Sequence, residues 1–307
     1  MKNFFSFLSR FSNKKIICFD GGGVRTIASI VFLKKLEAES GKKVSDIFDM
    51  FIGTSAGAFN AACFAYGGYS ADKIKRYWSK KYLDKIMQSS FFWDKASLIQ
   101  ARPRYESEGR IEVLNEIFGE STLKDTIKPF LSFAYNIETR QHEVHDSKHT
   151  PNITFRDAVA ASSAAPMYFP TYQMQDSSWM IDGSVVTNNP TLIGFKYAKK
   201  ILENENIKIL SMGSGHNKNK INGELSTKWG GVGWLRNDIM GMLLDSEIHN
   251  DISLDLFKEN YLRINSPIGK INRFLDDDSE ENLERIHLMG MEWWSTFGDE
   301  ALKFIEN

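Results

Sequence analysis

A chain of 307 residues, 42% of them hydrophobic and 25% charged, has the composition of a globular protein with one substantial core. The net charge of −1 and the lack of a long basic block or a nucleic-acid-reading motif exclude nucleic acid as an expected partner. The two cysteines, Cys18 and Cys63, lie in apolar runs, which excludes a disulfide framework and favours reduced, buried thiols in a cytoplasmic protein.

The N-terminal segment, residues 1–14, combines phenylalanines and a leucine with lysine and arginine and has no acidic residue. It lacks the long apolar centre and small-residue cleavage site of a secretory signal, and the chain has no apolar run long enough for a spanning helix. Two interpretations stay open. The segment is an amphipathic contact with a membrane surface, or it is a terminal helix packed on the domain.

The first part of the catalytic region alternates strands, glycine loops and helices. Lys15–Phe19 is a buried strand that ends before three glycines, and Val24–Glu39 has helical spacing. Ile47–Ile52 is a second buried strand, followed by another glycine loop and a small-residue helix through Ala65. This order predicts an α/β fold with a mainly parallel central sheet.

The middle of the chain continues this pattern with shorter elements. Capping and periodicity predict the following segments: a helix from Ser70 to Met87, a helix over Glu108–Phe118, a strand pair over Phe130–Ile137 and Gln141–His145, a capped helix over Thr154–Ala161, short strands over Trp179–Asp182 and Ile207–Met212, and a helix beginning at Pro190.

We assign residues 15–215 to a catalytic domain and residues 216–307 to a C-terminal loop and helical flank of the same domain. Residues 216–232 are polar and glycine-rich, and whether they form a lid stays open. A long helix is predicted over Trp234–Phe257, a strand over Tyr261–Ile264 and a last helix from Ser279. The acidic run Asp276–Asp278 lacks calcium-loop spacing and is expected to cap and solvate that helix.

The strongest local motif is G-x-S-x-G, formed by Gly53, Ser55 and Gly57 between a predicted strand and a predicted helix. Glycines allow the tight turn that projects a serine hydroxyl into open space at the start of a helix. The helix N-terminus also favours negative charge developing there. The pattern therefore makes Ser55 a candidate nucleophile.

A second motif, Asp20 followed by Gly21, Gly22 and Gly23 and then by Arg25, ends a strand and opens a helix. Such a run presents backbone N–H groups to an anion, which could be a phosphate or the oxyanion of an acyl-transfer intermediate. A dinucleotide-binding loop would have glycine where Thr26 stands, and the lysine of a P-loop is missing.

Together the two motifs resemble the patatin-like phospholipase family, and the similarity extends over most of the first 215 residues. An Asp-Gly pair far downstream completes the family pattern. Residues that share this resemblance are Gly21, Gly22, Gly23, Arg25, Gly53, Ser55, Gly57, Ser162–Pro166, Phe169, Pro170, Asp182, Gly183, Asn188–Pro190 and Leu210–Gly215. The chain departs from the pattern at Thr26, where glycine is usual, and at Ser184, where glycine or alanine is usual.

The resemblance implies a three-layer α/β/α fold and a lipid acyl hydrolase of the phospholipase A type. It implies a dyad in which Ser55 attacks an ester carbonyl and Asp182 acts as its base. The glycine loop would form the oxyanion hole, with Arg25 fixing the loop or a phosphate headgroup. The expected substrate is a phospholipid or related acyl ester at a transient membrane surface. No cofactor or metal is expected, the protein is expected to be cytoplasmic and peripherally membrane-associated, and an activating protein partner is left unknown.

Two alternatives remain beside the dyad. The first is a Ser-His-Asp esterase of the α/β-hydrolase type, for which the chain offers six histidines. Three of them lie in the charged stretch of residues 141–149, which we expect to be solvated surface. The second alternative is a catalytically silent, lipid-binding protein of the same fold, in which Ser55 serves only the turn and Asp182 only a cap.

Overall fold

The computed structural model describes residues 13–89, 102–218, 220–237, 241–242 and 247–306. The predicted N-terminal membrane contact, residues 1–14, falls almost entirely outside this part of the chain. Across the described ranges, every helix is too short or too polar to cross a lipid bilayer.

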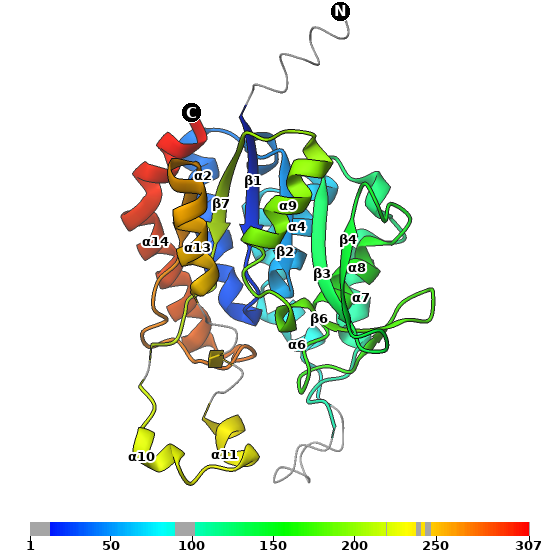
Figure 1. Ribbon diagram of the computed structural model, residues 1–307, viewed down its shortest axis with the longest axis vertical. Coiled ribbons are helices and arrows are strands. Elements are labelled where there is room, and N and C mark those ends of the chain that lie inside the picture. The colour runs from blue at the N-terminus through cyan, green and yellow to red at the C-terminus, as the bar shows by residue number, and fades with distance from the viewer. Residues whose placement is uncertain (1–12, 90–101, 219, 238–240, 243–246, 307) are drawn as a thin grey trace, which may run out of the picture.

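The centre of the described structure is an eight-stranded mixed sheet (Figure 1). Its strands are β1 (Lys14–Phe19), β2 (Met50–Thr54), β3 (Phe130–Asn136), β4 (Gln141–Asp146), β5 (Tyr172–Gln173), β6 (Trp179–Asp182), β7 (Ile207–Met212) and β8 (Tyr261–Ile264). They follow the order β5-β6-β3-β2-β1-β7-β8, with β4 beside β3. The segment from β3 to β8 is parallel, and β4, β5 and β6 are antiparallel additions at one end.

Helices and 3-10 turns connect these strands. They are η1 (Gly23–Thr26), α2 (Ile27–Ser40), α3 (Val44–Ile47), α4 (Ala56–Gly67), α5 (Ala71–Tyr77), α6 (Lys80–Ile86), α7 (Glu108–Phe118), η3 (Leu123–Asp125), α8 (Phe155–Ser162), η4 (Gly183–Val185), α9 (Thr191–Leu202), α10 (Gly223–Ser226), α11 (Gly231–Arg236), α13 (Ile248–Phe257), η5 (Lys258–Asn260) and α14 (Glu280–Glu306).

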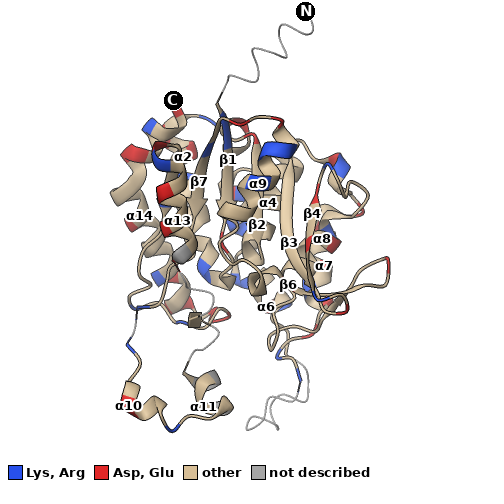
Figure 2. Ribbon diagram, viewed as in Figure 1, with Lys and Arg blue, Asp and Glu red and all other residues tan. Residues whose placement is uncertain are grey.

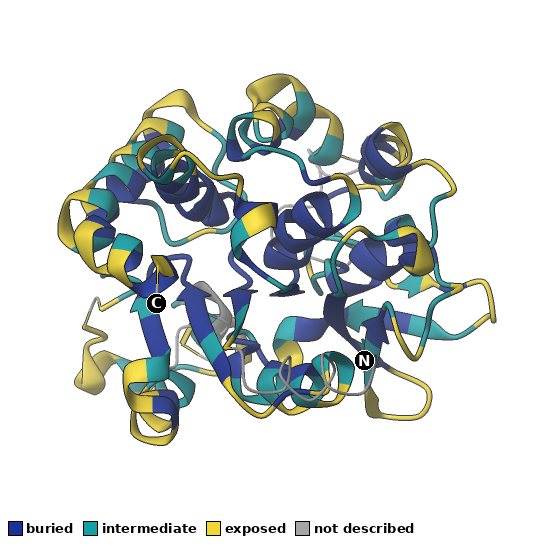
Figure 3. Cartoon of the chain, turned by 90° about the horizontal axis from the view of Figure 1, so that it is seen from above, coloured by how far each residue is buried: buried dark blue, intermediate teal, exposed yellow. Residues whose placement is uncertain are grey.

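The central strands are covered on both faces, so their sequences are nearly continuous apolar runs. Along β1, Ile17 and Phe19 face a core shared with α2, α4, α8 and α14, whereas Ile16 and Cys18 face a second core shared with α9 and α13. Viewed from above, buried strands lie between helices whose outer faces are exposed (Figure 3). The predicted three-layer α/β/α fold is therefore confirmed.

Charge on the surface of this fold is mixed. Figure 2 shows Lys and Arg interspersed with Asp and Glu over the helices, in keeping with the net charge of −1. Charges of both signs are therefore mixed over the described part of the chain.

One predicted helix is wrong in extent. The helix expected from Ser70 to Met87 is broken into α5 and α6, because the Trp78 indole N–H donates to Asn60 Oδ1 (2.8 Å) and Ser79 adopts extended backbone. Of the helix expected over Trp234–Phe257, the structure describes α11, which ends at Arg236, helical residues 241–242 and α13, which begins at Ile248; residues 238–240 and 243–246 lie outside the described residues.

Candidate active site

Ser55 occupies a strained turn between β2 and α4. Its φ of 55° and ψ of −128° lie in a region that non-glycine residues rarely adopt. The flanking glycines are required by close packing: a Cβ at Gly53 would collide with the Gly57 carbonyl, and a Cβ at Gly57 with the carbonyls of Phe19 and Asp20. The turn predicted for G-x-S-x-G is present in the structure. Strain of this kind is typical of functional positions.

The sheet brings Asp182 to this turn. β4 occupies one edge of β3, so β2 and β6 share the other edge in tandem. Thr54 pairs with Phe133, and Asp182 pairs with the next residue, Ala134. Strands β2 and β6 are antiparallel to each other and meet end to end, so the residue after Thr54 lies beside Asp182.

The side chains of the two residues are in contact. The Ser55 hydroxyl donates a hydrogen bond of 2.6 Å to Asp182 Oδ2, and the two residues are only 9% and 2% exposed. The other carboxylate oxygen, Oδ1, accepts from the Ser184 amide at 2.8 Å. The Ser55 amide donates to Ser162 Oγ at 3.0 Å. Both groups are thus held in one orientation by neighbours on the following turn and on α8.

Burial raises the pKa of Asp182 above its ordinary value. The hydrogen bonds from Ser55 and Ser184 and the positive charge of Arg110 act in the opposite direction but do not cancel the desolvation. A carboxylate whose pKa is raised is a stronger base than one in water, which suits proton transfer near neutral pH.

The glycine loop offers two free amides to this site. The Gly21 amide donates to the Asn188 carbonyl (3.1 Å), and the Val24 amide donates to the Leu275 carbonyl (2.9 Å). Within the described structure, no acceptor is recorded for the amides of Gly22 and Gly23, and both residues line the same pocket as Ser55. Of the three glycines predicted to hold an oxyanion, Gly22 and Gly23 are therefore the candidates, whereas the Gly21 amide is already bonded.

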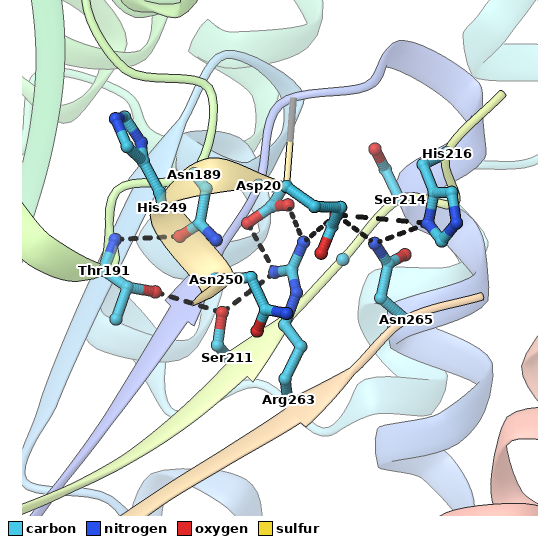
Figure 4. Close-up of polar contacts among 12 residues, drawn as sticks. Asp20, Asn189, Thr191, Ser211, Ser214, His216, His249, Asn250, Arg263 and Asn265 are labelled. Carbon is cyan, nitrogen blue, oxygen red and sulfur yellow. Dashed lines mark hydrogen bonds and ion pairs between the residues drawn. The ribbon is translucent and has the colours of Figure 1, made fainter. Parts of the chain in front are cut away.

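Asp20, which precedes the glycine loop, is anchored by a buried ion pair. Its carboxylate receives two hydrogen bonds from Arg263 on β8, at 2.9 and 2.6 Å (Figure 4). Arg263 also donates to Ser211 Oγ and Glu247, and Ser211 Oγ accepts from the Thr191 hydroxyl at 3.0 Å. This network ties the glycine loop to β7, β8 and the start of α13.

The structure places Arg110 in the pocket wall and leaves Arg25 out of the described lining. Arg25, predicted to hold the loop or a headgroup, is 1% exposed and is not among the described residues that line the pocket. Arg110 on α7 does line it, and sequence reasoning missed this residue. The available signal was its position: Arg110 stands on the same helical face as the apolar residues of α7, at Val113, Leu114, Ile117 and Phe118.

The pocket beside Ser55 is a cavity of about 210 Å³. Ser55, Asp182, Gly22 and Gly23 form part of its wall. The rest of the wall is mainly apolar and is formed by Phe59, Trp78, Leu83, Ile86, Met87, Val113, Leu114, Val159 and Phe169. Such a wall is suited to an acyl chain, since it offers apolar contact and few polar partners.

The C-terminal flank closes one side of this pocket through Gly241 and residues 273–276. Asp276, expected to be solvated, is instead largely buried, where it accepts from the Tyr105 hydroxyl (2.6 Å) and pairs with Arg104. The correction has a physical reason: a carboxylate can be buried when a cation and a hydroxyl satisfy it. The last helix is capped by Ser279, whose Oγ accepts from the Asn282 amide (3.4 Å), and Asp277 accepts from the Ser279 amide just before the helix.

The expectation of solvated histidines in residues 141–149 is wrong for His145. This side chain is 3% exposed, because β4 turns it into the core, and burial lowers its pKa to about 4. All six histidines lie in the described part of the chain, and none of them lines the pocket of Ser55. The position that a triad gives to histidine, hydrogen-bonded to the serine hydroxyl, is held by Asp182.

Comparison with known proteins places the chain among the lipid acyl hydrolases of phospholipase type. More narrowly, a sequence profile described as "Patatin-like phospholipase" matches residues 17–194, so the chain belongs to the patatin-like phospholipase family. The predicted family is confirmed.

The chain is 28% identical to "Patatin-like protein 4" of Arabidopsis thaliana, over 90% of this chain and 82% of that protein. It is 27% identical to "cGAMP-activated phospholipase" of Vibrio cholerae serotype O1, over 83% of this chain and 82% of that protein. Among solved structures, VipD from Legionella pneumophila is similar with a TM-score of 0.49 at 15% identity, over 93% of this chain and 67% of that chain.

Proposed function

We propose that the protein cleaves phospholipid or related acyl esters through an acyl-enzyme on Ser55, with Asp182 as general base. The observation that carries this proposal is the 2.6 Å hydrogen bond between the Ser55 hydroxyl and Asp182 Oδ2 in the wall of a mainly apolar pocket. Family membership supports the ester substrate, and the raised pKa of Asp182 supports its role as base.

In the proposed reaction, Ser55 Oγ attacks the ester carbonyl carbon while its proton passes to Asp182 Oδ2. The carbonyl oxygen becomes an oxyanion that accepts hydrogen bonds from the Gly22 and Gly23 amides. The intermediate collapses, the alkoxide leaves and takes the proton from Asp182, and an acyl-enzyme remains. Water then attacks the acyl carbon and gives its proton to Asp182, which returns it to Ser55 Oγ as the fatty acid is released.

We also propose that the enzyme works at a membrane surface to which it binds peripherally, with residues 1–14 as the contact. Residues 15–215 would supply Ser55, Asp182 and the glycine loop, and residues 216–307 would close the pocket. Support for the second part comes from residues 273–276, which line the pocket beside the glycine loop. None of the described pocket-lining residues comes from 216–232, so any action of that loop as a lid would require movement.

The test is fatty-acid release from phospholipid vesicles by wild type, Ser55→Ala and Asp182→Asn, each checked for folding by circular dichroism. Loss of release in both variants would support the dyad. Near-normal activity of Asp182→Asn would favour the histidine triad, and inactive wild type would favour the silent, lipid-binding protein. Because one relative is named for activation by cGAMP, each assay is run with and without that dinucleotide, so a dormant enzyme is separated from a silent one.

A further inference from the structure

We propose that Arg110 is a specificity-determining residue. Its guanidinium donates hydrogen bonds to the phosphodiester oxygens of the substrate lipid, in the pocket that holds Ser55 and Asp182. This inference rests on the proposed function and adds to it which lipids the site prefers. It follows from three features of Arg110: its burial, its two unused donors and its place beside the reacting groups.

Arg110 is a cation on an apolar face. It lies in the first turn of α7 and is only 4% exposed, with Val113 and Leu114 one turn further along the same wall of the pocket. In the described structure its recorded hydrogen-bond partner is Ser163 and no carboxylate pairs with it, although the charge of Asp182 is close enough to affect its pKa. A buried charge without a counter-ion is costly, so such a position is rarely occupied without a use.

The contacts of Arg110 fix the plane of its guanidinium and leave one edge unused. Nη1 donates to the Ser163 carbonyl (2.5 Å) and to Ser163 Oγ (3.1 Å), and Cζ lies 4.4 Å from the centre of the Phe169 ring. Nε and Nη2 are buried and have no hydrogen-bond partner in the described structure. These two nitrogens carry parallel N–H groups on one edge, the arrangement that binds two oxygens of a phosphate or carboxylate.

The chemistry of the substrate favours a phosphodiester as the occupant. In a glycerophospholipid the phosphodiester is attached to the carbon next to an acyl ester, so an ester carbonyl at Ser55 brings the phosphate close to the nucleophile. Burial lowers the pKa of Arg110 to about 10, which leaves the guanidinium protonated at neutral pH. A bound phosphodiester would give the guanidinium the directly hydrogen-bonded anion that it lacks, in surroundings where water competes weakly.

A carboxylate offers the same pair of oxygens, so the released fatty acid is the competing occupant. Its carboxylate, however, forms on the acyl carbon at Ser55, where the Gly22 and Gly23 amides are the proposed donors. The pocket thus has two sets of donors with separate roles. The Gly22 and Gly23 amides would bind the oxygen of the reacting carbonyl, and Arg110 would bind the phosphodiester. The experiment therefore compares both kinds of anion.

The test uses two lipids with the same acyl chains in the same neutral micelles: dioleoyl phosphatidylcholine and dioleoylglycerol. kcat/KM is measured on each for wild type, Arg110→Met, Arg110→Lys and the control Arg285→Met. Arg285 is an exposed arginine of α14, paired with Glu281. We expect the ratio of the phospholipid to the neutral lipid to fall by about tenfold or more in Arg110→Met, as for hydrogen bonds to a charged group. It should fall less in Arg110→Lys and stay constant in Arg285→Met.

An unchanged ratio in Arg110→Met would overturn the proposal, because equal losses on both lipids mean that Arg110 acts through folding or through Asp182. A pH profile separates these causes: loss of a cation near Asp182 moves the acid limb for both lipids alike. If Arg110→Met does not fold, Arg110→Lys takes its place: a fall in the ratio of phospholipid to neutral lipid would support the proposal, and an unchanged ratio would overturn it.

A binding measurement keeps the inference testable even if no lipid is hydrolysed. The probes are hexanoate and a short-chain diether phosphocholine that has no ester to cleave. We expect Arg110→Met to bind the diether about tenfold more weakly than wild type does, with hexanoate less affected. Weaker hexanoate binding with unchanged diether binding would assign the edge to a carboxylate and overturn the proposal. Absence of hydrolysis by wild type would contradict the proposed function alone.

Discussion

Ser55 and Asp182 lie 127 residues apart in the sequence, and their side chains share a hydrogen bond of 2.6 Å because β2 and β6 occupy the same edge of β3. The contact is a consequence of sheet register. A shift of one residue in the pairing of β6 would turn Asp182 to the opposite face of the sheet. The dyad geometry therefore depends on the whole of β3, including the part that binds β4 on its other edge.

The raised pKa of Asp182 predicts how activity depends on pH. The base must be deprotonated to accept the Ser55 proton, and burial disfavours the charged form, so its pKa lies above the ordinary value of 3.8. We expect kcat/KM to fall as pH falls through that raised pKa. A pH profile on a soluble ester, with circular dichroism at each pH, measures the effect. An acid limb at or below 3.8 would contradict the role of burial.

Gly23 predicts a test of the oxyanion loop. This residue has φ of 54°, and an added Cβ would collide with the Leu275 carbonyl. We expect Gly23→Ala to displace the loop and lower kcat by about 10²–10³-fold, the usual cost of losing an oxyanion donor.

The matched control for that change is Gly269→Ala. Gly269 has φ of 57° but nothing within 4 Å of an added Cβ, so the substitution brings the same backbone strain without the collision. Similar kcat values for Gly23→Ala and Gly269→Ala would mean that the position of the glycine loop does not matter for catalysis. Steady-state kinetics on a soluble ester makes the comparison.

The ion pair of Asp20 with Arg263 predicts non-additive stability changes. Both side chains are less than a tenth exposed, so removing one partner leaves a buried charge. We expect Arg263→Met to lower the free energy of unfolding by about 3–5 kcal/mol. The double variant Asp20→Asn with Arg263→Met should lose less than Arg263→Met alone. Urea unfolding of all three variants measures the cycle, and purely additive losses would show that the two residues are not coupled.

Much of this site can be predicted from the sequence because its glycines are required by local turn geometry. The turns around Ser55 and at Gly21–Gly23 require glycine because neighbouring atoms approach their Cα atoms closely. Both turns can therefore be predicted from the residue types and their spacing. Asp182 was found only by family resemblance, because nothing local says that β6 lies beside β2. The parallel sheet followed from the alternation of apolar runs with helices.

Charged residues are where sequence reasoning failed. The sequence analysis does not identify Arg110, and it assigns His145 and Asp276 to the surface, because charged and polar side chains are mostly exposed in globular proteins. Each is buried in the structure for a different reason: Arg110 lies in the pocket wall, β4 turns His145 inward, and Asp276 is satisfied by Arg104 and Tyr105. Such pairings depend on segments far apart in the chain.

The most direct test of the proposed mechanism is the rate at which a fluorophosphonate lipid analogue labels the protein, followed by peptide mass spectrometry. Wild type should carry the adduct on the peptide that contains Ser55, and Ser55→Ala should carry none. Labelling of Asp182→Asn should be slower by about 10⁴-fold or more, since even loss of the aspartate that only orients a triad histidine costs about 10⁴-fold. An adduct on another residue, or equal labelling of wild type and Asp182→Asn, would contradict the dyad.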